Sequence, residues 1–275
     1  IEDLHYSRLD LVLLRDHPHF WRYLIARPGM QLSDRIGDLG FSLYVANFAV
    51  GSLFLMYYLL RGRPLLIIAS AVLSIFVVQF FMNGRGAISW FGWMAILAVM
   101  FHPNVISLYI RVPALLFALL CCSVSSGTFS VAYISVLAYT ASRMRRGEIW
   151  KGVFVISVIL IAYNDLFLEG LVRNLSYYTL GTRNPLVNML RHGAGSIILN
   201  YPVIFVMVIP FFMAIALWAF LFLRPKPEPR EIFALVVPVA GGVFGYTTLT
   251  LLLPSLITVL ARRAGGLAAP RSRHR

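Results

Sequence analysis

The sequence predicts an all-α, polytopic integral membrane protein that crosses the bilayer about eight or nine times. Hydrophobic residues make up 59% of the chain and charged residues only 13%, whereas charged residues reach about 25% in soluble domains. The mean hydropathy is +0.79. The apolar residues form runs long enough for helices, and arginines stand at the ends of these runs. This pattern is typical of helices that cross a membrane.

The net charge of +13 does not indicate a nucleic-acid-binding protein. A nucleic-acid-binding surface is expected to be one continuous basic face, whereas these arginines are distributed over the ends of apolar runs, where they meet anionic lipid headgroups. We therefore predict the phospholipid bilayer as a partner and no nucleic acid. The two cysteines, Cys121 and Cys122, lie within an apolar run, which predicts a buried pair of thiols.

Residues 1–38 contain six of the eleven acidic residues of the chain. Their leucines and aromatic residues recur at helical spacing, which predicts amphipathic helices on the membrane surface, interrupted at Pro28–Gly29. Asp16, His17 and His19 do not have the spacing of a metal site, and we predict neither a metal nor a cofactor. The chain begins with Ile1 rather than Met, so we expect an additional transmembrane helix upstream.

Eight apolar runs follow, separated by polar or basic turns. In order along the chain they are Phe41–Leu60, Leu65–Met82, Ala87–Phe101, Val105–Cys122, Phe129–Ser142, Val153–Tyr163, Pro202–Leu223 and Ile232–Leu260. The densest basic turn, at residues 143–151, predicts that its end of the bundle faces the cytoplasm. In the fourth run Arg111 is expected at this inner interface, so the helix should start near Val112.

The last run, 232–260, is interrupted by glycines and a proline, and two interpretations remain open for it. It is either one long, kinked helix or two short helices in a re-entrant hairpin. The basic tail favours an even number of crossings, and therefore the hairpin. The predicted regions are an external amphipathic segment (1–38), transmembrane helices (39–163), an external substrate loop (164–200), C-terminal transmembrane helices (201–262) and a basic cytoplasmic tail (263–275).

The interval 164–200 is the longest polar stretch between apolar runs, and it is predicted to lie on the outer side. Positive-inside bias does not explain its arginines, nor Arg85 at the start of the third run. Arginine binds phosphate and carboxylate oxygens with a planar fork of donors. We therefore predict an outer cavity for an anionic, lipid-linked substrate. The alternative is that these arginines bind ordinary phospholipid. The arginines concerned are Arg85, Arg173, Arg183 and Arg191.

Three features together resemble the bacterial oligosaccharide repeat-unit polymerases, the Wzy-type O-antigen and exopolysaccharide polymerases. They are the Asn83–Ile88 segment that opens a helix, the serine-rich Ser125–Phe129 segment and the late external loop with arginines. The resemblance implies a metal-independent glycosyltransferase with a GT-C-like helical bundle in the bacterial inner membrane. Such an enzyme joins oligosaccharides carried on undecaprenyl diphosphate, with its active loop on the periplasmic side, beside other polysaccharide-assembly proteins.

For this chemistry the chain offers cations, bases and aromatic rings. The arginines named above would stabilise the departing diphosphate, and a base would accept the proton of the attacking sugar hydroxyl. The candidate bases are His192, Asp165 and Glu169. The candidate sugar-stacking residues are Trp21, Tyr177 and Tyr178.

Two other classes of function compete with the polymerase. A transporter or flippase would also place arginines over a cavity, and the broken apolar runs are compatible with discontinuous helices. No internal repeat and no acidic residue in mid-span supports it, however. A non-catalytic subunit of a membrane complex would instead cover residues 164–200 with a partner. A rhomboid-type hydrolase lacks support because no G-x-S-x-G motif is present.

Overall fold

A computed structural model describes residues 20–60, 84–102, 107–144, 149–179, 228–241, 251–252 and 254–262. All regular structure in these ranges is helical, which confirms the predicted all-α class. The named helices are α1 (Phe20–Ile36), α2 (Asp38–Leu60), α4 (Gly84–Phe101), α5 (Leu108–Cys122), α6 (Ser126–Ser142), α7 (Ile149–Thr179) and α11 (Pro229–Gly241). Residues 251–252 and 254–262 are also helical, and we call them the final helix.

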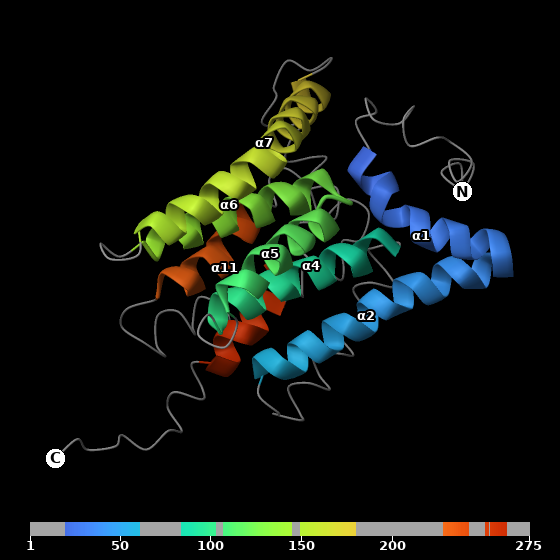
Figure 1. Cartoon of the computed structure of the whole chain (residues 1–275), viewed down its shortest axis with the longest axis horizontal. Helices are drawn as coiled ribbons and strands as arrows, with labels where there is room; N and C mark the ends of the chain where they lie inside the picture. Colours follow the sequence, from blue (N-terminus) through green and yellow to red (C-terminus); the bar gives the residue numbers. More distant parts are fainter. Residues whose placement is uncertain are drawn as a thin grey trace, which may run out of the picture.

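The centre of the bundle is α4, which packs against α2, α5 and α6 (Figure 1). Its side chains are almost completely buried, including Trp90 and Trp93. Glycines allow the close helix crossings. A Cβ atom at Gly92 would lie 2.5 Å from the backbone oxygen of Ala118 on α5. Small residues at such crossings are typical of packed membrane helices.

The C-terminal end of α4 collects the ends of several other helices. Tyr139 of α6 donates a hydrogen bond to the carbonyl of Met100, at 3.0 Å. Arg230 at the start of α11 donates to the carbonyl of Phe101, at 3.4 Å. These contacts satisfy carbonyls that a helix end leaves unpaired. We call this the basic end of the bundle, and define it by the residues Arg111, Arg143, Lys151, Arg230 and Arg262.

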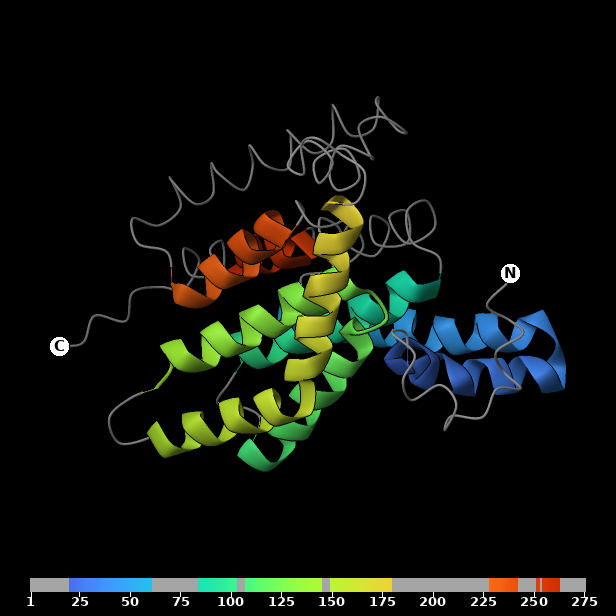
Figure 2. The ribbon, with the colours of Figure 1, turned by 90° about the horizontal axis from the view of Figure 1, so that it is seen from above.

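The final helix returns to the point where α11 begins. Arg262 Nη2 lies 3.1 Å from both carboxylate oxygens of Glu228, the residue before α11. A straight helix over 229–262 would separate its ends by about 50 Å. A single straight helix over this range is therefore excluded. The re-entrant hairpin stays a prediction, because residues 242–250 and 253 lie outside the described residues. Figure 2 shows α11 beside the final helix, in orange and red.

The start of α11 is determined by local chemistry. Pro229 occupies its first position, where a missing N–H costs nothing. The Glu231 carboxylate accepts a hydrogen bond from the backbone N–H of Glu228, at 3.1 Å, which is one half of a capping box. Glu231 is completely buried. The interaction stabilises the first turn of α11.

Two predicted interruptions are wrong. We expected a break at Pro28–Gly29, yet α1 runs through Pro28. Tyr44 of α2 donates to the carbonyl of Ile25, at 2.5 Å, and so ties α1 to α2 within the turn before the proline. We also expected the helix with Arg111 to start near Val112, but α5 begins at Leu108 and continues through Pro113, although a proline there cannot donate a hydrogen bond to the carbonyl of Tyr109.

The predicted end of a helix near Tyr163 is also wrong, because α7 continues to Thr179. The apolar face persists beyond Tyr163. Phe167 stacks on Tyr133 with ring centroids 4.8 Å apart, and Gly170 is buried, whereas Asp165 and Glu169 are exposed. Polar residues on one face therefore do not end this helix. The remaining part of the predicted loop, 180–200, lies outside the described residues.

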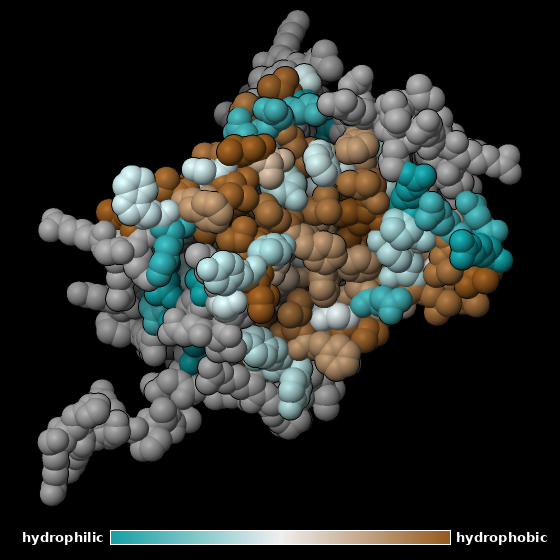
Figure 3. Space-filling model, viewed as in Figure 1, coloured by the Kyte–Doolittle hydropathy of each residue, from teal (hydrophilic) through white to brown (hydrophobic). Residues whose placement is uncertain are grey.

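Two helices, α2 and Ile149–Arg173 of α7, are long and apolar enough to cross a membrane by length and composition. Shorter apolar helices occur at Gly86–Phe101 and Tyr109–Cys122. Large hydrophobic side chains on these helices are exposed, among them Phe54 at 71% and Ile161 at 87%. Figure 3 shows this apolar surface as a brown area between polar groups at the margins of the molecule. The predicted runs 65–82 and 202–223 lie outside the described residues.

Candidate functional site

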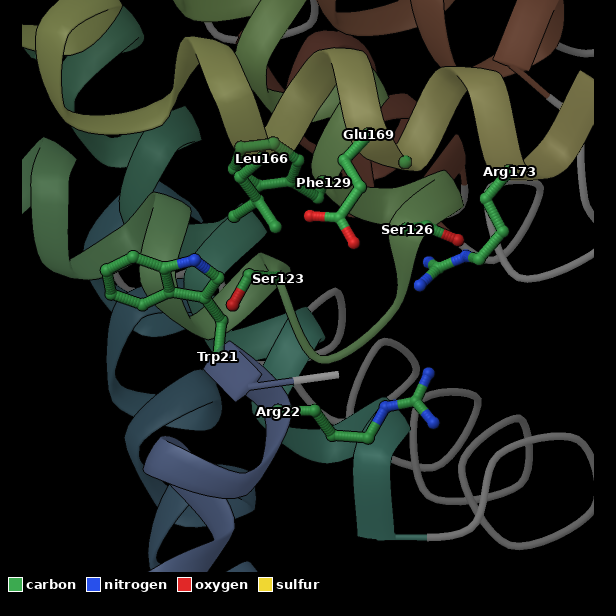
Figure 4. A pocket seen from close by; sticks show the side chains of 9 residues that line it. Trp21, Arg22, Ser123, Ser126, Phe129, Leu166, Glu169 and Arg173 are labelled. Carbon is green, nitrogen blue, oxygen red and sulfur yellow. The ribbon is translucent and has the colours of Figure 1, made fainter. Parts of the chain in front are cut away.

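A pocket lies between the N-terminal end of α1, the turn between α5 and α6, and the second half of α7 (Figure 4). Its cavity measures about 20 Å³ and opens to solvent. It lies at the place where α5 ends and α6 begins, away from the basic end. The lining residues are Trp21, Arg22, Ser123, Ser126, Phe129, Leu166, Glu169, Gly170 and Arg173.

The second half of α7 supplies the acid and one cation of the pocket. Glu169 and Arg173 are four residues apart, so they lie on one face of the helix. Gly170 between them brings α7 close to α6, because a Cβ atom there would lie 3.7 Å from that of Ser126. In Figure 4 the Glu169 carboxylate points into the pocket, and the Arg173 guanidinium points towards Ser126.

The turn between α5 and α6 forms a firmly bonded side of the pocket. Thr128 Oγ1 lies 2.9 Å from the carbonyls of both Cys122 and Ser125. Ser123 donates its hydroxyl to the carbonyl of Leu120, at 2.6 Å. Arg22 Nε donates to the carbonyl of Val124, at 3.0 Å. These bonds tie the start of α1 to the turn, and they hold Arg22 at the edge of the pocket.

Behind the pocket lies a cluster of aromatic rings. The ring of Tyr163 is 6.0 Å from that of Trp21 and 5.8 Å from that of Phe129, measured between centroids. The Tyr163 hydroxyl is anchored by a hydrogen bond to the carbonyl of Leu116, at 2.8 Å. Because aromatic rings packed in this way have little freedom to move, the cluster gives the pocket a rigid apolar side.

The two sides of the pocket differ in chemistry. Figure 4 shows Trp21, Phe129 and Leu166 towards one side, and Ser126, Arg173 and Arg22 towards the other. Ser126 is the first residue of α6, so the positive end of that helix dipole adds to the two arginines. Among the described residues, Glu169 is the single acid that lines the pocket. This arrangement suits an amphipathic ligand with an anionic group.

The structure brings together three of the predicted site residues, namely Trp21, Glu169 and Arg173. Asp165 does not line the pocket and is exposed. It stands one helical turn before Glu169, and that turn carries it about 6 Å along the axis. Asp165 is therefore a poor candidate for the base.

The other predicted site residues are only partly placed. Arg85 is the second residue of α4, and Tyr177 and Tyr178 lie in the last turn of α7. His192, Arg183 and Arg191 lie outside the described residues. Sequence reasoning missed Arg22, although its position beside Trp21 was a usable signal. It also gave no binding role to Ser123, or to Ser126 in the serine-rich segment Ser125–Phe129.

No group of three or more His, Cys, Asp or Glu side chains within the described ranges is placed to hold a metal ion. The two cysteines are buried and unpaired, as the sequence predicts. The functional groups of the pocket are thus two guanidinium groups, one carboxylate, two hydroxyls and an indole.

Comparisons with known proteins find no counterpart for this arrangement. No protein-family model matches the chain, and neither a curated protein nor a solved structure matches it. The geometry of the pocket is therefore the basis on which a function can be proposed.

Proposed function

We propose that this chain is a multi-pass protein of the bacterial inner membrane that polymerises oligosaccharide repeat units carried on undecaprenyl diphosphate. In this proposal the pocket faces the periplasm, the basic end faces the cytoplasm, and the whole chain crosses the bilayer about eight or nine times. The enzyme uses no metal or cofactor. The observation that carries the proposal is that Trp21 on α1 meets Glu169 and Arg173 on α7, far from it in sequence, at one pocket.

Each of these side chains has a role in glycosyl transfer. The hydroxyl of the acceptor sugar attacks the anomeric carbon of the donor, a new C–O bond forms there, and the bond from that carbon to the diphosphate oxygen breaks. Arg173 and Arg22 stabilise the negative charge on the departing diphosphate. Glu169 accepts the proton of the attacking hydroxyl, and Trp21 supports a sugar ring.

The exposed apolar surface supports the membrane location. The α2 helix has 23 residues, which is a length of about 35 Å and enough to cross a bilayer core. Only 17% of its most apolar window is buried inside the protein. Lipid is a natural environment for the apolar surface that this helix leaves uncovered.

The test is complementation of a bacterial host that lacks its own repeat-unit polymerase, read as the ladder of surface glycan on a gel. The wild-type chain should restore long glycan. Glu169→Gln should lower the rate of chain extension by about 10²-fold or more, since it removes a general base. Arg173→Ala should also shorten the ladder, and Arg173→Lys should rescue it only in part because an ammonium lacks the forked donors.

Asp165→Asn is the matched control, because it also removes a carboxylate from α7 but lies outside the pocket. It should support long glycan at the same protein level. A wild-type chain that never lengthens glycan would refute the polymerase. Activity in Glu169→Gln equal to that of the wild type would refute the role of Glu169.

A further inference from the structure

We propose that the basic end of the bundle is a docking surface for the anionic phospholipid headgroups of one leaflet. The proposal rests on the proposed membrane location but not on glycosyl transfer. It concerns the face formed where α4 and α6 end and where α5, α7 and α11 begin. The pocket described above lies elsewhere and takes no part in it.

The charges of the described residues are unequally divided between the two ends. Among the described residues, the basic end has five cations and two acids, Glu228 and Glu231, a net charge of +3, whereas the rest has five arginines and four acids, a net charge of +1. The arginines of the rest are Arg22, Arg27, Arg35, Arg85 and Arg173. Both acids of the basic end are engaged within the protein. Glu228 pairs with Arg230 and Arg262, and Glu231 is buried against the start of α11. The other described acids, Asp34, Asp38, Asp165 and Glu169, lie on α1, α2 and α7 away from this end.

Two of the cations project from one corner of the bundle. Arg143 follows α6 and Lys151 lies in the first turn of α7, and both side chains are exposed. The corner itself is packed, because Met144 lies against Gly152, 2.6 Å from where a Cβ atom would stand. Arg143 is supported by Tyr139, whose hydroxyl accepts from Arg143 Nε at 3.2 Å. An exposed arginine held in this way can bind phosphate at little cost in side-chain entropy.

Exposed aromatic side chains also lie at the basic end, in the first turns of α5 and α7. Trp150 is 85% exposed and Tyr109 is 90% exposed, although both residues have large apolar rings. Exposed apolar residues stand next to them, including Phe154 at 56% and Ile110 at 64%. Tryptophan and tyrosine are enriched where the hydrocarbon core meets the headgroups. The occupant of this boundary is therefore a lipid surface, with acyl chains against the apolar residues and anionic headgroups against the cations.

The test is the thermal stability of the full-length protein in bilayer discs of phosphatidylcholine, with and without phosphatidylglycerol. We expect phosphatidylglycerol to raise the midpoint of unfolding by about 3 °C, and high salt to remove most of the difference. The double variant Arg143→Gln, Lys151→Gln should lose at least half of the shift. Both side chains are exposed, so the variant should fold.

Arg35→Gln is the control, because Arg35 is also exposed but lies at the last turn of α1. It should keep the full shift. Equal midpoints in the two lipids, or an equal loss of the shift in Arg35→Gln, would overturn the docking surface. Retention in the membrane pellet after alkaline extraction tests the membrane location separately. The glycan ladder tests the polymerase, so the failure of each proposal can be told apart.

Discussion

Trp90 and Trp93 are two buried tryptophans of α4 whose indole nitrogens have different surroundings. Trp93 Nε1 donates to Ser255 Oγ in the final helix, at 2.9 Å. Trp90 Nε1 is buried and has no hydrogen-bond partner among the described residues. The pair therefore separates the contribution of a hydrogen bond from that of an aromatic ring in the same helix.

We predict that Trp93→Phe lowers the free energy of unfolding by about 1 kcal/mol more than Trp90→Phe does. Both changes remove similar volume from a buried site, but only Trp93→Phe breaks a hydrogen bond. Reversible unfolding of the purified protein in detergent measures the difference. If the two variants lose the same free energy of unfolding, the hydrogen bond to Ser255 adds no net stability.

Replacing Gly92 with alanine should destabilise the protein, whereas the same change in a helix interior usually stabilises it. Glycine to alanine in a helix interior normally stabilises by about 1 kcal/mol. At Gly92, however, the new Cβ atom would meet the backbone oxygen of Ala118 at 2.5 Å, and a backbone cannot move aside as a side chain can. We predict that Gly92→Ala destabilises the protein by about 1–3 kcal/mol. The change in Tm of the purified protein checks this.

Gly170 is the matched control for Gly92. Its nearest neighbour would be Ser126 Cβ at 3.7 Å, an ordinary van der Waals distance. The Tm of Gly170→Ala should therefore stay the same or rise. A lower Tm for Gly170→Ala than for Gly92→Ala would contradict the proposed clash at the crossing of α4 and α5.

Among the helices, α11 and the final helix depend on their shared contact at the basic end. Arg230 and Arg262 lie over the ring of Phe101, with the guanidinium carbons 5.7 and 5.5 Å from its centroid. Glu228 lies between the two arginines and pairs with both. The contact joins three helix ends, although the side chains remain partly exposed.

We predict a coupling free energy of about 0.5–1 kcal/mol between Glu228→Gln and Arg262→Gln in a double-mutant cycle. The value is small because the Arg262 and Glu228 side chains are 27% and 32% exposed, so water screens the pair. Chemical denaturation of the four proteins at low salt measures it. A coupling of zero would show that packing alone holds the two helices together.

For α7, the sequence pattern was insufficient to locate the end of the helix. Polar residues begin at Asn164 and predict the start of a loop, but they occupy the exposed face of a helix that continues to Thr179. The bend visible in Figures 1 and 2 carries this second half towards the start of α1. The pocket exists because of this continuation, since Glu169 and Arg173 would have no fixed position on a loop.

At the scale of the whole molecule, the two ends of the described part differ in their charge and in their exposed aromatic residues. The basic end collects Lys151 and four arginines, whereas the exposed corner between α1 and α2 carries Asp34 and Asp38 beside Arg35. In the proposed orientation, positive-inside bias predicts that the basic end faces the cytoplasm. The two native cysteines are buried, so new cysteines at the surface can report this orientation.

We predict that a membrane-impermeant maleimide labels Asp34→Cys in cells whose outer membrane has been permeabilised and whose cytoplasmic membrane is intact. Lys151→Cys should be labelled only after that membrane is permeabilised. The reason is that the two positions lie on opposite sides of the proposed bilayer. Labelling of Lys151→Cys alone in the intact preparation would reverse the orientation. The wild-type chain is the control, and it should remain unlabelled in both conditions.

The sequence by itself determined the helical class and the main helix positions. Apolar runs at 41–60, 87–101 and 129–142 are helical as predicted, because hydrophobic residues of this density can satisfy their backbone in few other ways once water is excluded. It also identified Trp21, Glu169 and Arg173 as functional candidates from their chemistry. These inferences depend on local composition, and local composition can be read along the chain.

The tertiary structure decided which of those candidates meet. Nothing in the spacing of Trp21 and Glu169 indicates that they line one pocket, and nothing near Arg22 indicates that its partner is the carbonyl of Val124. Likewise, the sequence does not indicate that Arg262 forms an ion pair with Glu228. Such contacts depend on how helices cross and where they bend. Crossings and bends follow from packing among all the helices, which no single segment encodes.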